Sequence, residues 1–153
     1  PGVTTAEVSA TNRKPHLELK GDSVRTALVG QPITFIANAW DDGLPKPVVA
    51  PPWYGSPFDS ALGTLRSSAG LRVAWFVYRG KGTAVTFDPP QFKVFVDVRG
   101  GSPWSPGWSA PPIPTDNLWI TRAIFSEPGM YVVRCLAHDG GLSIYQDVTV
   151  HVQ

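Results

Sequence analysis

The sequence is short of uninterrupted helix-forming stretches and of cysteine. Of its 153 residues, 15 are glycine and 16 are proline, and the longest segment without either, Thr115 to Glu127, has 13 residues. A helical bundle needs several uninterrupted periodic segments of roughly 10 to 20 residues, so this composition argues against one and predicts a β-rich protein. The single cysteine, Cys135, excludes an internal disulfide. At this length, one domain with its own core is expected.

The sequence also lacks an excess of charge of one sign, and it lacks long apolar runs. Thirteen Lys and Arg residues oppose twelve Asp and Glu residues, and the basic residues are scattered apart from Arg13 and Lys14. Nucleic-acid binding needs a clustered positive surface, so no nucleic-acid partner is expected. No apolar run approaches the roughly 20 residues of a transmembrane segment. The chain begins at Pro1 without a signal-peptide pattern, which we interpret as either a processed mature protein or a piece of a longer one.

Motifs for catalysis and for zinc are absent as well. His16, His138 and His151 show neither a His-x-His nor a His-Glu-x-x-His spacing, so no zinc site is expected. There is no Gly-x-Ser-x-Gly elbow, phosphate loop or dinucleotide-binding fingerprint. Three glutamates disfavour a paired-carboxylate hydrolase. We therefore expect a protein that is not an enzyme and that has no cofactor, calcium being the one exception considered below.

Alternation of apolar and polar residues predicts seven or eight short strands separated by turn residues. Such a pattern is typical of an all-β, antiparallel sandwich of two layers. We expect Phe35, Trp75, Tyr131 and Val150 to lie between the layers, with Cys135 on the inward face of its strand. The predicted strands are 16–29, 32–40, 71–78, 83–87, 118–125, 130–137 and 144–152, with 92–98 as an additional edge strand.

Stretches at both ends of the chain carry a family resemblance. They are NRKP at 12–15, GQPITF at 30–35, DDG at 41–43, AIFSEPGMYVVR at 123–134, AHDGGLS at 137–143 and DVTV at 147–150. These stretches resemble PKD-like and related immunoglobulin-like repeats of bacterial surface proteins, over roughly residues 12–43, 71–88 and 118–152. The Trp-Asp-Phe-Gly-Asp-Gly signature of PKD domains is absent, and the sequence AWFVY at 74–78 occupies the corresponding position. The resemblance implies a non-catalytic, extracytoplasmic bacterial module, in the periplasm, at the cell surface or secreted, that serves in spacing, adhesion or assembly.

Two segments rich in proline and aromatic residues, at about 44–70 and 88–117, interrupt the strand pattern. Disordered linkers are usually poor in aromatic residues, so we expect both segments to be long ordered insertions. Their aromatic side chains either pack the insertions onto the sandwich or form a platform for sugar rings or for another protein. The candidate binding residues are Trp53, Tyr54, Phe58, Trp104 and Trp108.

Aspartates follow two of the predicted strands. Asp41 and Asp42 end the strand 32–40, and Asp139 ends the strand 130–137. Immunoglobulin-like topology places the loops after these strands at one pole, together with both insertions. If the predicted strand 92–98 pairs as an extra hairpin arm, residues 99–117 instead start at the far pole and run along one side. Carboxylate oxygens are ligands that Ca²⁺ takes, whereas Asp-Gly is also the ordinary chemistry of a tight turn. The sequence therefore leaves a calcium site at Asp41, Asp42 and Asp139, and a set of turns, as alternatives.

Residues 1–12 form a β-prone arm ahead of the single predicted domain, 13–153. Such an arm either lies on its own sandwich or adds a strand to a neighbouring subunit. Our first hypothesis is a structural or assembly subunit of a bacterial envelope or extracellular complex, which contacts protein partners or copies of itself through the arm and the insertions. The alternative is a carbohydrate-binding or adhesion module that uses the aromatic insertions.

Overall fold

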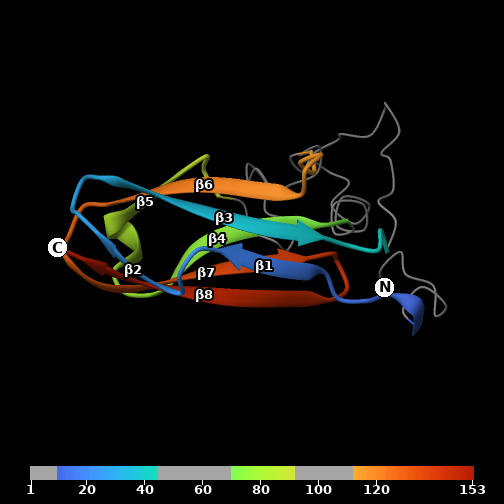
Figure 1. Ribbon diagram of the computed structural model, residues 1–153. Coiled ribbons are helices and arrows are strands. Elements are labelled where there is room, and N and C mark those ends of the chain that lie inside the picture. The colour runs from blue at the N-terminus through green and yellow to red at the C-terminus, as the bar shows by residue number, and fades with distance from the viewer. Residues whose placement is uncertain (1–9, 45–69, 92–111) are drawn as a thin grey trace, which may run out of the picture.

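The computed structural model describes residues 10–44, 70–91 and 112–153, which form eight strands and one short 3₁₀ helix (Figure 1). The predicted edge strand 92–98, residues 1–9 of the arm and most of both insertions lie outside the described residues. The elements are β1 (His16–Lys20), β2 (Val24–Ala27), β3 (Pro32–Trp40), β4 (Arg72–Arg79), η1 (Gly82–Ala84), β5 (Val85–Asp88), β6 (Leu118–Phe125), β7 (Gly129–His138) and β8 (Ser143–Val152).

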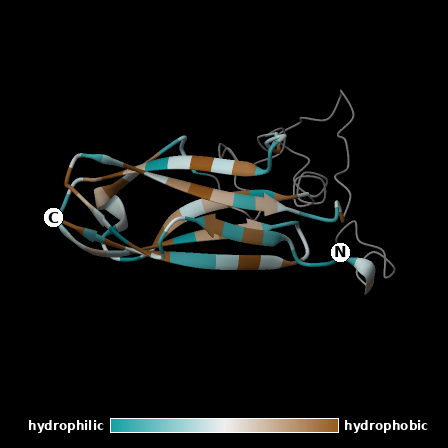
Figure 2. Cartoon of the chain, in the orientation of Figure 1, coloured by the Kyte–Doolittle hydropathy of each residue, from teal (hydrophilic) through white to brown (hydrophobic). Residues whose placement is uncertain are grey.

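The strands form two four-stranded sheets packed face to face, which confirms the predicted β-sandwich. One sheet has the order β1-β3-β6-β5 and the other has the order β2-β8-β7-β4. Figure 2 shows apolar and polar residues alternating along several strands, as expected when one face of each sheet is buried. The orders β1-β3-β6-β5 and β8-β7-β4 correspond to the orders A-B-E-D and G-F-C of the two layers of an immunoglobulin-like sandwich.

The prediction of one continuous strand over 16–29 is wrong, because the chain changes sheets within it. Gly21 has a φ of +85°, a conformation that favours glycine, and it separates β1 from β2. β1 then pairs antiparallel with β3, whereas β2 pairs with β8 in parallel, with Val24 opposite Thr149. The sandwich is therefore antiparallel except for this one short parallel pair.

The core lies between the sheets, where the sequence predicted it. Phe35, Trp75, Tyr131 and Val150 are all buried, and the rings of Phe35 and Trp75 lie 5.0 Å apart between centroids. Cys135 is fully buried opposite Trp75 in the register of β4 and β7. Burial raises the pKa of its thiol, so Cys135 behaves as a small apolar side chain of the core.

Tyr131 fixes the turn between β6 and β7. Its hydroxyl donates a hydrogen bond to the backbone oxygen of Glu127, 2.9 Å away, and its ring packs on Phe125 at 4.9 Å between centroids. A tyrosine bonded back to the chain a few residues upstream is a hallmark of immunoglobulin-type sandwiches, where it holds this corner. The corner lies at the end of the molecule opposite the N-terminal segment (Figure 1).

Three connections meet at the other end, which we call the N-terminal pole. The amide of Gly70, just before β4, donates to the oxygen of Asp139 after β7, at 2.7 Å. The amide of Ala39 in β3 donates to the oxygen of Asn117 before β6, at 3.0 Å. Gly70 and Asn117, the residues that follow the two insertions, therefore lie at this pole, and Gly70 contacts the loop between β7 and β8. The C-terminus lies at the opposite pole (Figure 1).

Candidate functional site

The aromatic residues predicted to bind a ligand, Trp53, Tyr54, Phe58, Trp104 and Trp108, lie outside the described residues. The structure therefore does not test whether they form a platform. It does show where the flanking residues lie: 44, 70 and 117 are near the N-terminal pole, whereas Gln91, before the second insertion, bonds to Trp75 of β4 and to Thr121 of β6. The glycan-binding alternative stays a prediction.

The three aspartates do come together at the N-terminal pole. Asp139 is fully buried, and its Oδ1 accepts hydrogen bonds from the amides of Gly141 and Leu142, both at 2.6 Å. Its Oδ2 accepts a bond from the side-chain amide of Asn12 at 3.1 Å. The pKa of Asp41 is raised, mainly because burial penalises its charged form, and the charges of Asp139 and Asp42 add to this effect.

The two aspartates after β3 also bond to nearby backbone amides. Asp41 Oδ2 accepts from the amide of Gly43 at 3.0 Å, and Asp42 Oδ1 accepts from the amide of Leu44 at 2.9 Å. Asp42 Oδ2 accepts from the amide of Arg13, also at 3.0 Å. These contacts are the chemistry of tight turns, and together with the Asn12 contact they fasten the incoming chain to the pole.

Two oxygens at this pole have no hydrogen-bond partner, although both are buried: Oδ1 of Asn12 and Oδ1 of Asp41. Within residues 10–44, 70–91 and 112–153, however, no group of three or more His, Cys, Asp or Glu side chains is arranged to hold a metal ion. A site would thus need backbone or amide oxygens in addition to carboxylates, as calcium accepts. Calcium binding here stays a prediction.

The three histidines are dispersed, as their spacing indicated. The ring of His16 stacks on Trp40 with 5.0 Å between centroids, and His151 is exposed on β8. His138 lies at the N-terminal pole, where its Nδ1 accepts a hydrogen bond from the amide of Gly140 at 2.8 Å. Burial lowers the pKa of His138, the nearby charge of Arg72 lowers it further, and Asp139 opposes both effects.

An exposed aromatic and cationic stack, which the sequence did not reveal, lies on the outer face of the sheet β2-β8-β7-β4. The guanidinium of Arg134 on β7 lies between the rings of Tyr78 on β4 and Tyr145 on β8, at 3.6 and 3.7 Å from the ring centroids. Asp147 binds the same guanidinium through two bonds of 2.7 and 2.8 Å. This bond raises the pKa of Arg134, so the group is a permanent cation.

The signal for this stack was present in the alternation of the strands. Tyr78 and Tyr145 both occupy outward positions, where 47% and 55% of their surface is exposed. Large aromatic residues at outward positions are costly in solution and common at binding surfaces. Sequence alone does not show which strands become neighbours. The register of β4, β7 and β8 is needed to see that Tyr78 and Tyr145 lie on either side of Arg134.

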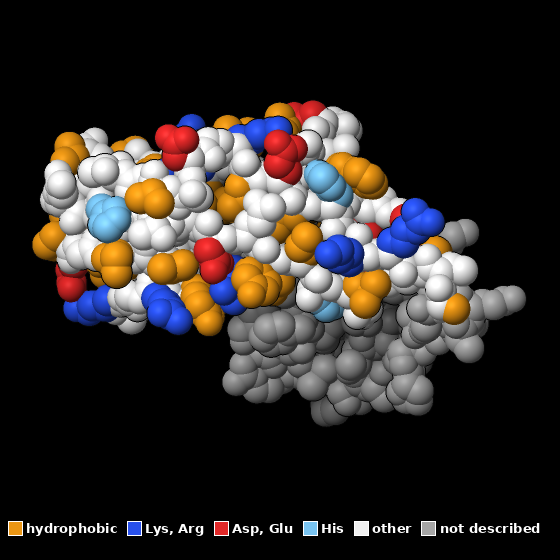
Figure 3. Space-filling view, turned by 60° about the horizontal axis from the view of Figure 1, so that its bottom comes forward, with side chains coloured by type: hydrophobic (Ala, Val, Ile, Leu, Met, Phe, Trp, Pro, Cys, Tyr) orange, Lys and Arg blue, Asp and Glu red, His pale blue; other side chains and the backbone are white. Residues whose placement is uncertain are grey.

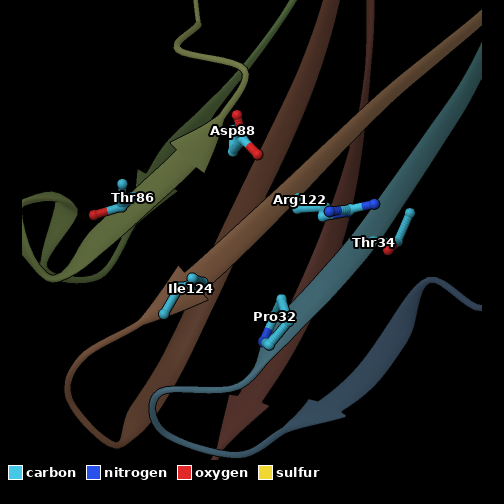
Figure 4. Close-up of a pocket in the computed structure, with 6 residues that line it drawn as sticks. All are labelled: Pro32, Thr34, Thr86, Asp88, Arg122 and Ile124. Atoms are coloured by element: carbon cyan, nitrogen blue, oxygen red, sulfur yellow. The ribbon is translucent and has the colours of Figure 1, made fainter.

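The opposite outer face, on β1-β3-β6-β5, carries a shallow hollow of about 280 Å³. The hollow lies over the ends of β3, β6 and β5 near the C-terminal pole, and the side chains of Asp88 and Arg122 lie on neighbouring strands beside it (Figure 4). Its lining residues are Pro32, Thr34, Thr86, Asp88, Arg122 and Ile124. The described part of the chain contains no helix long and apolar enough to cross a membrane.

No family model matches the sequence, and no curated protein matches it. Similar solved structures include the Lin-41 filamin domain (14% identity, TM-score 0.41, covering 90% of this chain and 91% of that one) and titin M4 (11%, 0.42, 93% and 98%). A structure of S-layer protein SbsC domains 4 and 5 is also similar (12%, 0.41), and the match covers 91% of this chain and 53% of that one. At this level of similarity these structures carry no functional argument, and the immunoglobulin-like sandwich rests on the strand order itself.

Proposed function

We propose that this chain is a non-catalytic, extracytoplasmic immunoglobulin-like module that makes protein–protein contacts as a structural or assembly subunit of a bacterial envelope or extracellular complex. The observation that carries the proposal is the stack of Tyr78, Arg134 and Tyr145 on an exposed sheet face. Tyrosine and arginine are enriched among the residues that dominate binding energy at protein interfaces. Asp147 and the two rings hold Arg134 in one place before a partner arrives, which reduces the entropy lost on binding.

The geometry of the stack favours a protein partner over a glycan. The guanidinium occupies one face of each tyrosine ring, at 3.6 and 3.7 Å from the centroids. A sugar-binding platform needs open ring faces, and here one face of each ring is already in use. The partly exposed rings of Tyr78 and Tyr145 and the partly exposed carboxylate of Asp147 offer a mixed apolar and polar surface of the kind found in protein interfaces.

A second set of contacts is proposed at the N-terminal pole. Asn12 and Arg13 are bonded to Asp139 and Asp42, so the arm leaves the sandwich from a fixed point. Gly70 and Asn117, which follow the two insertions, lie at the same pole. We place contacts of the arm and of the insertion loops with neighbouring subunits there, in keeping with the first hypothesis from the sequence.

An affinity-capture experiment with the immobilised chain tests the proposed protein-binding function. Extracts of the source cell envelope would be passed over the immobilised wild-type chain, over Arg134→Ala and Tyr145→Ala, and over Lys81→Ala as a control from the exposed end of another loop. Loss of a contact residue of this kind is expected to weaken binding by about 30-fold. The expected result is a polypeptide retained by the wild type and by the control and lost from both stack variants. Equal retention by all four would contradict a role for the stack.

The size of the purified chain, with and without residues 1–12, tests the arm. An assembly subunit is expected to form a larger species that is lost or altered without the arm. A strict monomer in both forms, combined with no retained polypeptide, would refute the assembly function as a whole.

A further inference from the structure

Arg72, the first residue of β4, is a buried cation without a counter-ion among the described residues. Its surface is 8% exposed, and its Nε is buried without a hydrogen-bond partner. No carboxylate of residues 10–44, 70–91 and 112–153 forms an ion pair with its guanidinium. Burial lowers the pKa of Arg72, and no described acidic neighbour opposes that effect. A buried charge left unpaired is costly, so this site is built for an anionic partner.

The acidic residue that follows β7 does not supply this partner. Asp139 Oδ1 accepts from the amides of Gly141 and Leu142, and its Oδ2 accepts from the side chain of Asn12. Arg134, on the outer face of the same sheet, differs from Arg72 because Asp147 binds its guanidinium through two bonds of 2.7 and 2.8 Å. Arg72 therefore needs a carboxylate of the kind that Arg134 already has.

His138 and Ser143 place further hydrogen-bond donors beside Arg72. Arg72 lies opposite His138 in the register of β4 and β7, and His138 lies opposite Ser143 in the register of β7 and β8. All three alternate with core residues of their strands, so they share the outer face, where opposite Cβ atoms lie about 5 Å apart. Nδ1 of His138 accepts from the amide of Gly140, so the neutral ring carries its proton on Nε2. A guanidinium, an imidazole N–H and a hydroxyl thus form one row across three strands, without an acceptor among the described residues.

We infer that Arg72, His138 and Ser143 form a carboxylate-binding site, which takes an acidic side chain of the partner protein. The planar fork of an arginine matches both oxygens of a carboxylate, and hydrogen bonds between charged groups are stronger than neutral ones. Four residues of β7 separate His138 from Arg134, about 13 Å, so one partner can contact both this site and the tyrosine stack. Figure 3, which turns the β8 side toward the viewer, shows basic, acidic and apolar side chains interspersed there, so a charged group is held by local contacts. The inference deepens the proposed protein-binding function, on which it rests, by naming the chemistry of the partner.

Titration of the full chain with sodium acetate, followed by nuclear magnetic resonance, tests the site. Sodium chloride at the same ionic strength controls for screening of charge. Acetate, unlike chloride, is expected to shift the Nε signal of Arg72 and the Nε2 signal of His138 until they saturate. Arg72→Gln should weaken binding, measured at His138, by at least about 10-fold, because it removes charge-assisted bonds. Arg122→Gln, an exposed arginine of the opposite sheet, is the matched control and should bind acetate as the wild type does. The absence of a saturable shift, or undiminished binding by Arg72→Gln, would overturn the inference.

The stability of the isolated chain distinguishes a carboxylate of a partner from one of the chain's own. The acidic residues outside the described ranges are Glu7, Asp59 and Asp97. If a partner supplies the carboxylate, Arg72→Met removes an unpaired buried charge and is expected to raise the melting temperature by about 3 °C. If the chain supplied it, the same substitution would leave that carboxylate unpaired and lower the melting temperature. A lowered melting temperature therefore overturns the assignment to a partner.

The affinity capture described above separates failure of this inference from failure of the proposed function. Retention of a polypeptide captured through Arg134 should fall by about 10-fold for Arg72→Gln. Undiminished retention by this variant would overturn the inference and leave the proposed function standing. A chain that retains no polypeptide but binds acetate through Arg72 would lose the proposed function, whereas the carboxylate site would stand.

Discussion

The side chain of Gln146 on β8 bonds to the backbone of Leu19 on β1 as a neighbouring strand would. The amide of Leu19 donates to Gln146 Oε1, and Gln146 Nε2 donates to the oxygen of Leu17, both at 3.1 Å. Gln91 closes the other side of the sandwich: its Oε1 accepts from the amide of Trp75 at 2.9 Å, and its Nε2 donates to Thr121 Oγ1 at 3.0 Å. Two glutamines thus join the sheets and occupy edge groups open to strand addition.

Gln146→Ala is expected to destabilise the fold by about 1 to 2 kcal/mol, because it leaves two backbone groups of β1 without their partner. It should also increase aggregation, because the edge of β1 becomes available to other chains. Urea denaturation and light scattering measure the two effects. Gln31→Ala removes an exposed glutamine from the turn before β3 and is the matched control. If both variants unfold at the same urea concentration, the side chain does not join the sheets.

Gly80→Ala is expected to cost more stability than Gly30→Ala. Both glycines have a positive φ, +104° and +76°, which an L-residue adopts at a cost of about 1 kcal/mol or more. A Cβ at Gly80 would also lie 2.8 Å from the Tyr131 ring and 3.3 Å from the backbone oxygen of Met130, whereas nothing lies within 4 Å of one at Gly30. The difference between the two free energies of unfolding isolates the steric conflict at the tyrosine corner. Equal losses would show that the Tyr131 ring moves aside freely.

Much of this fold was predictable because burial leaves a period of two in the sequence. Phe35, Trp75, Tyr131 and Val150 were assigned to the core on that basis, and all four are buried. The division of the first strand was not predictable, because Gly21 alone does not indicate that the chain changes sheets. Interaction surfaces were the least predictable part, since the contact of Arg134 with two tyrosines depends on which strands become neighbours.

Acidification is expected to destabilise the N-terminal pole through His138. The folded pKa of this ring is lowered below its ordinary value, so the unfolded state binds the proton more readily. Stability is therefore lost as the pH falls below about 6.5 toward the folded pKa. Protonation of Nδ1 would also remove the bond from the amide of Gly140. Urea denaturation of the wild type and of His138→Gln at two pH values on either side of this range should show a smaller loss for the variant. Identical losses would assign the effect to other groups.

The glycan alternative has its own test at the insertions. If Trp104 and Trp108 form a stacking platform, an array of glycans should show binding by the wild type that each tryptophan-to-alanine variant weakens. Loss of a stacking aromatic residue is expected to cost about 1 kcal/mol or more of binding energy. Arg134→Ala is the control, because it alters the proposed protein-binding face. No binding to any glycan, or binding that the tryptophan variants leave unchanged, would exclude the alternative.

One substitution at the N-terminal pole, Asp41→Asn, distinguishes a calcium site from a set of turns. Without calcium, Asp41→Asn should raise the melting temperature, because the folded pKa of Asp41 is raised, so its ionised form destabilises the fold at neutral pH. The amide keeps an oxygen to accept the bond from Gly43. With about 5 mM calcium, above the dissociation constants of extracellular modules, a bound ion would stabilise the wild type by mass action and would stabilise the variant less.

Asp22→Asn, in the turn between β1 and β2, is the matched control for the loss of one carboxylate. It should respond to calcium as the wild type does, because it lies outside the N-terminal pole. If calcium leaves the melting temperature of all three proteins unchanged, the aspartates serve the turns alone.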